Sequence, residues 1–284
     1  MGIRGVWTLF KDLFKNVEPV RLNSLKIGID IFNLAYTHKS SLDELLEILA
    51  TWSATGHQLV CVWDGVAPKE KQAIVGERRS IRDSATEKRK DLEVYLEEYK
   101  GQLNDTDIKH IKTAITSLNW QGWHMTNKLK KEIQERLGPN VEHIFAEGEA
   151  DDILIDMAFE KRLDVVVTLD SDLFVMGTPR IWRVMRVRGE WLVEDISVES
   201  VCNDWGISLG ILQDAAYLAG WDRCHTQGGT FMPFETALTR AKHYGGWKTV
   251  LEKTGGLDDK FTGTQESLVN LKKMSRERWL NILK

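Results

Sequence analysis

Acidic residues follow three short apolar runs of this chain. Asp30 ends the run KIGID, Asp64 follows LVCVW, and VVVTL is followed by Asp170 and Asp172 with one serine between them. Ligands of open α/β sheets bind at the carboxyl ends of the strands, so acids that end separate parallel strands should share one crevice. The segment EGEADD, residues 147–152, adds further carboxylates. The chain therefore has more acids at these places than folding requires.

Such a cluster predicts a metal site. Carboxylates held close together cannot all stay ionised unless a cation compensates their charge. The candidate donors are oxygen atoms, with no histidine or cysteine among them, and this set suits Mg²⁺ or Mn²⁺ rather than Zn²⁺.

Each acid also has a structural alternative. Asp30, Asp64 or Asp170 taken alone could be a turn or N-cap residue. The acids of EGEADD could favour a helix start, because the positive end of a helix dipole stabilises them. We interpret Asp151 and Asp152 in this second way.

The elements around these acids predict a parallel sheet. Residues 25–31 and 58–63 are expected strands, and a helix between them begins at the capping-box pattern Ser41-x-x-Glu44 and stops at Gly56. This order describes a βαβ unit, whose strands are parallel. Residues 141–145 and 163–169 are further strands, with a helix over about 149–162 between them, and residues 182–193 form a hairpin or edge strands.

The fold class predicted is therefore α/β, a mostly parallel twisted sheet flanked by helices. Between the second and third strands the sequence is long, charged and weakly hydrophobic, with helical patterns near 88–100 and over 108–118. We interpret it as a helical insertion without a core of its own. The expected divisions are 1–83 and 141–203 for the sheet domain, 84–140 for the insertion, and 204–284 for a C-terminal helical unit with a basic tail.

Composition indicates a soluble protein of a reducing, intracellular compartment. The cysteines, Cys61, Cys202 and Cys224, are scattered and odd in number, and the N-terminal segment resembles neither a signal peptide nor a membrane span. The net charge of −4 argues against a nucleic-acid partner at first, but basic residues gather in 69–82, 180–188 and 270–284.

Six motifs in order carry a resemblance to a known family. MGIRGVW is similar to MGIxGL, IDIFNLAY to VDAxxxxY, VWDGVAPKEKQAIVGERRSIR to FDGxxPxxKxxxxxxRxxxR, EGEADD to EAEAxCA, TLDSDLFVMGTPRIWR to TEDxDxLxFGxPxxxR, and AYLAGWDR to LLGxDY. The sequence resembles the XPG-type structure-specific 5′ nucleases, which include the flap endonucleases, over roughly residues 1–253. The short, divergent form is similar to viral or organellar members.

The resemblance implies a PIN-like fold with a two-ion site of seven acids: Asp30, Asp64, Glu147, Glu149, Asp170, Asp172 and Asp222. Two Mg²⁺ ions about 4 Å apart, for which Mn²⁺ can substitute, activate a water and stabilise the leaving oxygen of a phosphodiester.

Basic and aromatic residues are also implied. Lys71 and Arg78 are seven residues apart, on one face of an expected helix, and the family places such residues at the scissile phosphate. Arg79 and Arg82 follow as further nucleic-acid contacts, and the alternative is a solvated basic face. Tyr36 corresponds to an aromatic that stacks on a base, with a core tyrosine as its alternative. Gly2 is implied as a nucleic-acid contact by the N-terminal motif.

The insertion corresponds to the family's helical arch, which a free 5′ single strand passes. Trp120 and Trp123 within it are expected to form the core of this cap rather than a stacking surface.

The helical unit departs from the family pattern. Relatives have a GxGxxxA turn that holds duplex phosphates with K⁺, whereas this chain has Gly228-Gly229 followed by TFMPFE. This departure puts both duplex binding and the K⁺ site in doubt. No sliding-clamp motif is recognised at the end of the sequence.

The function expected is a two-metal structure-specific 5′ nuclease acting near junctions between single-stranded and duplex DNA in replication, repair or recombination, as a monomer without a membrane. Nucleus, organelle and viral replication site are not distinguished. The alternatives are a 5′-3′ exonuclease or RNA-processing nuclease on the same fold, and a non-catalytic protein that binds branched DNA.

Overall fold

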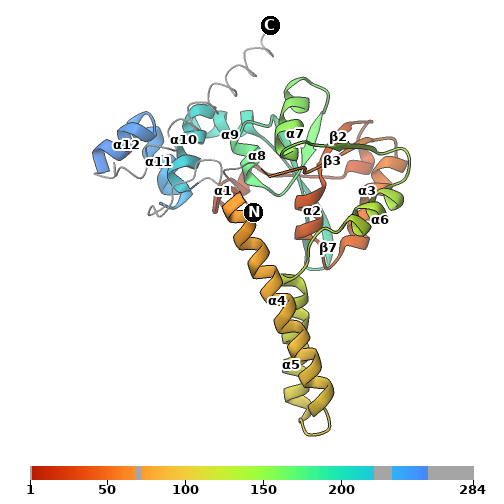
Figure 1. Cartoon of the computed structure of the whole chain (residues 1–284). Coiled ribbons are helices and arrows are strands. Elements are labelled where there is room, and N and C mark those ends of the chain that lie inside the picture. Colours follow the sequence, from red (N-terminus) through yellow and green to blue (C-terminus); the bar gives the residue numbers. More distant parts are fainter. Residues whose placement is uncertain (1, 68–71, 221–231, 255–284) are drawn as a thin grey trace.

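A computed structural model describes residues 2–67, 72–220 and 232–254 of the 284-residue chain. Figure 1 shows three parts: a central sheet with helices on both sides, a long helical arm that projects downward in this view, and a group of helices at the left.

The sheet has seven strands in the order β1-β7-β6-β5-β2-β3-β4. The pairs β2–β3, β2–β5, β3–β4 and β5–β6 are parallel, and β7 is antiparallel to β6 and β1. The strands are β1 Lys15–Val17, β2 Lys26–Asp30, β3 Gln58–Trp63, β4 Glu142–Phe145, β5 Val165–Val167, β6 Arg180–Val187 and β7 Glu190–Ser197. The predicted mostly parallel α/β fold and the hairpin near Gly189 are both confirmed.

Each face of the sheet has its own apolar core, because successive side chains of a strand point to opposite faces. Val60 and Val62 of β3 belong to the core on one face, with helix α7 (Ala150–Phe159) and helix α8 (Ser171–Val175). Cys61 and Trp63 belong to the other core, with α2 (Ile31–Thr37), α3 (Leu42–Ala54) and α6 (Asn127–Leu137). The acids that end the strands therefore lie at the edge of a sheet that is packed against an apolar core on each face.

Helix α3 corrects one sequence prediction. It begins at Leu42 as expected, with Ser41 as its N-cap, but the Ser41 side chain makes no capping hydrogen bond. The capping box predicted there is therefore absent as a side-chain interaction. The helix is held by its buried stripe instead, which includes Leu45, Leu46 and Leu49.

The arm consists of α4 (Gln72–Tyr99) and α5 (Asp105–Gln121), which pack against each other (Figure 1). No residue of α5 is buried. Helix α4 is continuous through the predicted division at residue 84.

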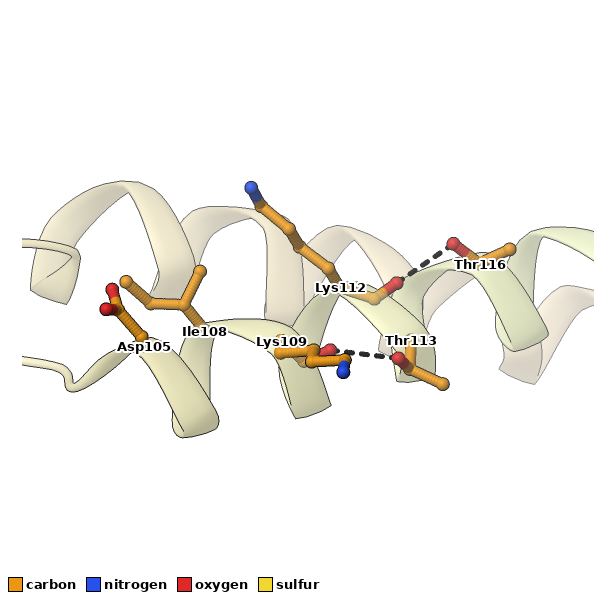
Figure 2. Close-up of a pocket in the computed structure, with 6 residues that line it drawn as sticks. All are labelled: Asp105, Ile108, Lys109, Lys112, Thr113 and Thr116. Carbon is orange, nitrogen blue, oxygen red and sulfur yellow. Dashed lines mark hydrogen bonds between the residues drawn. The ribbon is translucent and has the colours of Figure 1, made fainter.

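An open groove of about 400 Å³ lies along α5. Figure 2 shows six residues that line it. The Thr113 and Thr116 hydroxyls donate to the Lys109 and Lys112 carbonyl oxygens, each at 2.9 Å, so the groove's hydroxyl donors are used within the helix. Its charged groups are Asp105 and these two lysines.

The remaining elements are short or belong to the C-terminal helical unit. Helices α10 and α11 pack closely, and both contact α12. These elements are α1 Val6–Leu9, η1 Lys11–Leu13, η2 Pro19–Arg21, α9 Val198–Trp205, α10 Leu209–Ala219, α11 Phe234–Tyr244 and α12 Trp247–Thr254.

Burial raises the pKa of the Cys61 and Cys202 thiols, both of which are free, and Cys224 lies outside the described residues.

Candidate active site

Asp30 is almost fully buried and lies at the centre of the candidate site. It ends β2 and is the N-cap of α2, where its Oδ1 accepts from the Asn33 N–H at 3.2 Å. Its Oδ2 accepts from the Thr168 hydroxyl at 2.9 Å. Only 4% of the residue is exposed. A carboxylate held by two donors in this way is fixed in direction.

Burial raises the pKa of the Asp30 carboxyl well above its ordinary value. The negative charges of Asp151, Asp64 and Asp170 raise this pKa further, whereas the hydrogen bond from Asn33 lowers it. Carboxylates from the end of β3, the end of β5 and the start of α7 therefore act on the carboxylate that ends β2, at the carboxyl edge of the sheet.

Asp64 is positioned by hydrogen bonds between the loop that follows β3 and the loop that follows β4. The Gly65 N–H donates to the Gly148 carbonyl at 2.7 Å, and the Val66 N–H donates to the Glu147 carbonyl at 3.0 Å. Asp64 Oδ1 accepts from the Ala150 N–H at 2.8 Å. These hydrogen bonds hold Asp64 against the EGEADD segment.

Glycine is required at position 65 because the two loops approach so closely. A Cβ atom there would lie 2.1 Å from the Ala146 carbonyl oxygen and 2.5 Å from that of Glu147.

Asp170 and Asp172 are positioned by the turn between β5 and α8. Asp170 is the N-cap of α8, and its Oδ1 accepts from the Asp172 N–H at 3.0 Å. The Asp170 N–H donates to Thr168 Oγ1, also at 3.0 Å, and Thr168 donates in turn to Asp30. Asp172 is 4% exposed. One hydroxyl thus links the acid of β2 to those that follow β5.

The N-terminal segment packs directly beneath this turn. Gly2 has φ +63°, and a Cβ atom on it would lie 2.4 Å from both Asp170 Oδ1 and Ser171 Oγ. The Ile3 N–H donates to Ser171 Oγ at 2.7 Å, and Trp7 Nε1 donates to the Leu169 carbonyl at 2.8 Å. Gly2 is therefore at the site, and its contact with nucleic acid stays a prediction.

The two glutamates of EGEADD differ in environment. Glu147 is exposed, and Glu149 is the partly buried N-cap of α7. Asp222 lies outside the described residues. Whether these seven acids bind metal stays a prediction.

Asp151 is a member of the site that sequence reasoning missed. It lies in the first turn of α7 with Asp152, as the helix-start interpretation expected, but it also raises the pKa of Asp30 more than any other charge does. Its position in the helix could have indicated that it faces the sheet, because Asp151 precedes the buried Leu154 and Ile155 by three and four residues. It therefore lies on the stripe of α7 that faces the sheet.

The donor set fits a hard divalent cation. Within the described ranges, no three carboxylate, imidazole or thiol groups lie close enough together to hold one ion as they stand. Burial, together with the negative charges of Asp151, Asp64 and Asp170, nevertheless disfavours the charge on Asp30. A cation bound by carboxylate oxygens would remove that penalty.

The predicted basic residues lie at the start of the arm. Helix α4 begins at Gln72, directly after Lys71, which lies outside the described residues. Arg78 and Arg79 are exposed, Arg82 is partly buried, and the Arg79–Asp83 ion pair of 3.8 Å is on the surface. Their contacts with a phosphate stay predictions.

Tyr36 is 39% exposed, so the alternative of a core tyrosine is wrong. Its ring meets the Trp123 ring edge-on at 5.8 Å, and Lys39 Nζ lies 4.5 Å from the Tyr36 ring centroid. The same ammonium donates to the Trp120 carbonyl at 2.5 Å. Trp123 therefore connects the arm to α2, and its assignment to a separate core of the cap is wrong.

The basic segment 180–188 is largely neutralised by partners distant in sequence. Arg180 pairs with Asp195 at 2.9 Å, Arg183 with Glu194 at 2.9 Å, and Arg186 with Glu44 at 3.0 Å. These contacts leave much less free positive charge than the sequence indicates. The other predicted contacts of the helical unit, Gly228 and Gly229, lie outside the described residues, as does the 270–284 tail.

Residues 140–222 match the family model of the XPG I-region, a span that contains Glu147, Glu149, Asp170, Asp172 and Asp222. No curated protein matches the chain in sequence.

Solved structures share the fold. The catalytic core of Rad2 is 19% identical with a TM-score of 0.60, and the match covers 99% of this chain and 79% of that one. Flap endonuclease-1 from Methanococcus jannaschii is 19% identical with a TM-score of 0.56, covering 94% and 83%. Human GEN1 in complex with Holliday junction DNA is 15% identical with a TM-score of 0.56, covering 98% and 63%.

No helix among residues 2–67, 72–220 and 232–254 has the length and apolar character needed to cross a membrane.

Replacing Gly65 by alanine should lower the free energy of unfolding by about 2–4 kcal/mol, because the new methyl group overlaps a backbone carbonyl and separates the two loops. Gly148→Ala is the matched control, since a Cβ atom at Gly148 meets nothing within 4 Å. Urea denaturation of the two variants checks this. Equal midpoints would contradict the close approach of the loops.

The raised pKa of Asp30 predicts a pH-dependent cost in stability. In chelator, Asp30→Asn should unfold at higher urea than wild type at pH 7, because it removes a buried charge among like charges. The folded-state pKa exceeds the unfolded one, so the difference should grow as pH rises above the ordinary value of 3.8 and become constant above the raised pKa. A variant less stable than wild type at pH 7 would show that the ionised Asp30 carboxylate does not destabilise the fold.

Proposed function

We propose that this chain belongs to the XPG-type 5′ nuclease family and is a metal-dependent nuclease that hydrolyses phosphodiester bonds near junctions between single-stranded and duplex DNA. The observation that carries the proposal is the buried Asp30 carboxylate with three further carboxylates acting on it, the four acids coming from separate places in the chain at the carboxyl edge of the sheet. Related structures add support, since Rad2 and GEN1 were solved with DNA.

The acids of the site would hold two divalent ions, with Mg²⁺ as the natural choice for oxygen donors. A structure of GEN1 with product DNA and Mg²⁺ supports this choice. When bound, such ions supply charge neutralisation at the phosphate and a water of lowered pKa. The proposed ligands are Asp30, Asp64, Glu147, Glu149, Asp170, Asp172 and Asp222, with Asp151 added to the set derived from sequence.

The chain's own groups fix the direction of these ligands. Thr168 donates to Asp30 and accepts from the Asp170 N–H, so its hydroxyl sets the relation between two ligands without binding a cation itself. Outer-shell donors of this kind orient carboxylate ligands. The loop that follows β3 fixes the direction of Asp64, because its Gly65 and Val66 N–H groups are bonded to the EGEADD segment.

Basic residues at the start of α4 would hold the substrate phosphate. Lys71 and Arg78 would neutralise charge that develops on the phosphate oxygens, while Arg79 and Arg82 would bind neighbouring phosphates. Because α4 continues into the arm, the single-stranded part of the substrate would run along the arm's base (Figure 1). The products would carry a 5′ phosphate and a 3′ hydroxyl, without a covalent enzyme intermediate.

Cleavage of 5′-labelled flap, nicked and single-stranded substrates tests the function. Wild type should cut flap DNA in Mg²⁺ and not in chelator. Thr168→Val should lose about 10- to 100-fold in rate, the loss typical of an outer-shell partner, and Asp172→Ala should lose more than that.

Glu160→Gln, on the exposed end of α7, is the control and should cut like wild type. Binding of flap DNA without cleavage in either Mg²⁺ or Mn²⁺ would indicate a non-catalytic binder and overturn the proposal. A preference for single-stranded ends or for RNA would instead identify an exonuclease or an RNA-processing enzyme.

A further inference from the structure

Phe145 is an exposed aromatic residue beside the acids, and the proposed chemistry gives it no role. It is the last residue of β4, the outermost strand on its side of the sheet, and it is 59% exposed. Phenylalanine in a strand is usually buried, so this degree of exposure asks for an explanation.

The ring of Phe145 is held in a defined orientation. It stacks on the Trp63 ring, with centroids 5.8 Å apart and planes at 15°, and Trp63 is fully buried. Trp63 is fixed in turn, because its Nε1 donates to His143 Nδ1 at 3.1 Å and its ring meets Phe32 edge-on at 6.2 Å. One face of Phe145 therefore rests on a rigid support, and its exposed surface faces solvent.

This ring lies close to the proposed reaction centre. Phe145 pairs with Trp63 in the parallel register of β3 and β4, and Trp63 is followed directly by Asp64. Glu147 follows Phe145 by two residues. Adjacent strands are about 4.8 Å apart, so the backbone at Phe145 lies beside the strand end that Asp64 follows.

Positive charge accompanies the aromatic residues. Lys130 of α6 places its Nζ 4.9 Å from the centroid of Phe32, which itself contacts Trp63. Aromatic rings next to basic groups are the usual surface for single-stranded nucleic acid, since every base has a π-face and every linkage a negative charge. A protein partner is less well matched, because Phe145 and the nearby Val66 are only two side chains, well below the area of a stable protein interface.

We propose that Phe145 is a stacking platform for a nucleobase of the single-stranded part of the substrate, next to the scissile phosphate. The ligand is one base of a single strand, recognised without sequence preference. The proposal rests on the proposed nuclease function, and it adds a residue that orients the strand to be cut.

Binding of flap DNA that carries 2-aminopurine at successive positions of the single strand tests the platform, in Ca²⁺ to prevent cleavage. One position near the junction should be quenched by wild type and by Phe145→Trp. Phe145→Leu, which keeps apolar volume but lacks a flat ring, should lose the quenching and weaken binding by about 5- to 150-fold. Tyr99→Leu, which removes a ring 41% exposed at the end of α4, should leave both unchanged.

The outcomes separate this proposal from the nuclease assignment. If wild type binds and cuts flaps while Phe145→Leu keeps both quenching and affinity, the platform is wrong and the nuclease stands. If wild type binds no nucleic acid, both are overturned. If Phe145→Leu binds DNA like wild type but no longer binds a purified protein that wild type binds, the ring is a protein contact and the platform is wrong. Thermal denaturation of each variant excludes loss of binding through unfolding.

Discussion

The burial of Asp30 among other carboxylates is the constraint on which the candidate site depends. Asp30 is almost fully buried, and the negative charges of three further acids oppose its ionisation. Such an arrangement is costly unless a cation compensates it, so it would not persist as a device for folding. The Thr168 hydroxyl, the Gly65 loop and the N-terminal segment under Asp170 all serve to hold these acids where they repel.

The placement of Asp30, Asp64 and Asp170 could be predicted from sequence, because each follows an apolar run whose length and composition suit a parallel strand. The carboxyl ends of such strands meet at one edge, so their neighbours in space follow from the fold class alone. Asp151 could not be placed as easily. Its role depends on which side of α7 faces the sheet, and the pattern of acids alone suggested only a helix start.

Contacts between distant segments were the other source of error. The arginines of 180–188 looked like a basic patch, but the β6–β7 register pairs Arg183 with Glu194, and the tertiary fold brings Glu44 to Arg186. Trp123 looked like part of a cap core, yet it reaches Tyr36 on α2. A tract of like charge or apolar side chains does not identify its partners, which are set by packing of elements far apart in the chain.

The central claim is that the acids around Asp30 form a site for divalent metal, and metal stoichiometry tests it most directly. Titration of the chelator-treated full chain with Mn²⁺, followed by electron paramagnetic resonance of the free ion, should give two bound ions per chain at pH 7. Asp30→Asn should lose at least one of them. No saturable binding by wild type, or the same stoichiometry and affinity in Asp30→Asn, would contradict the account.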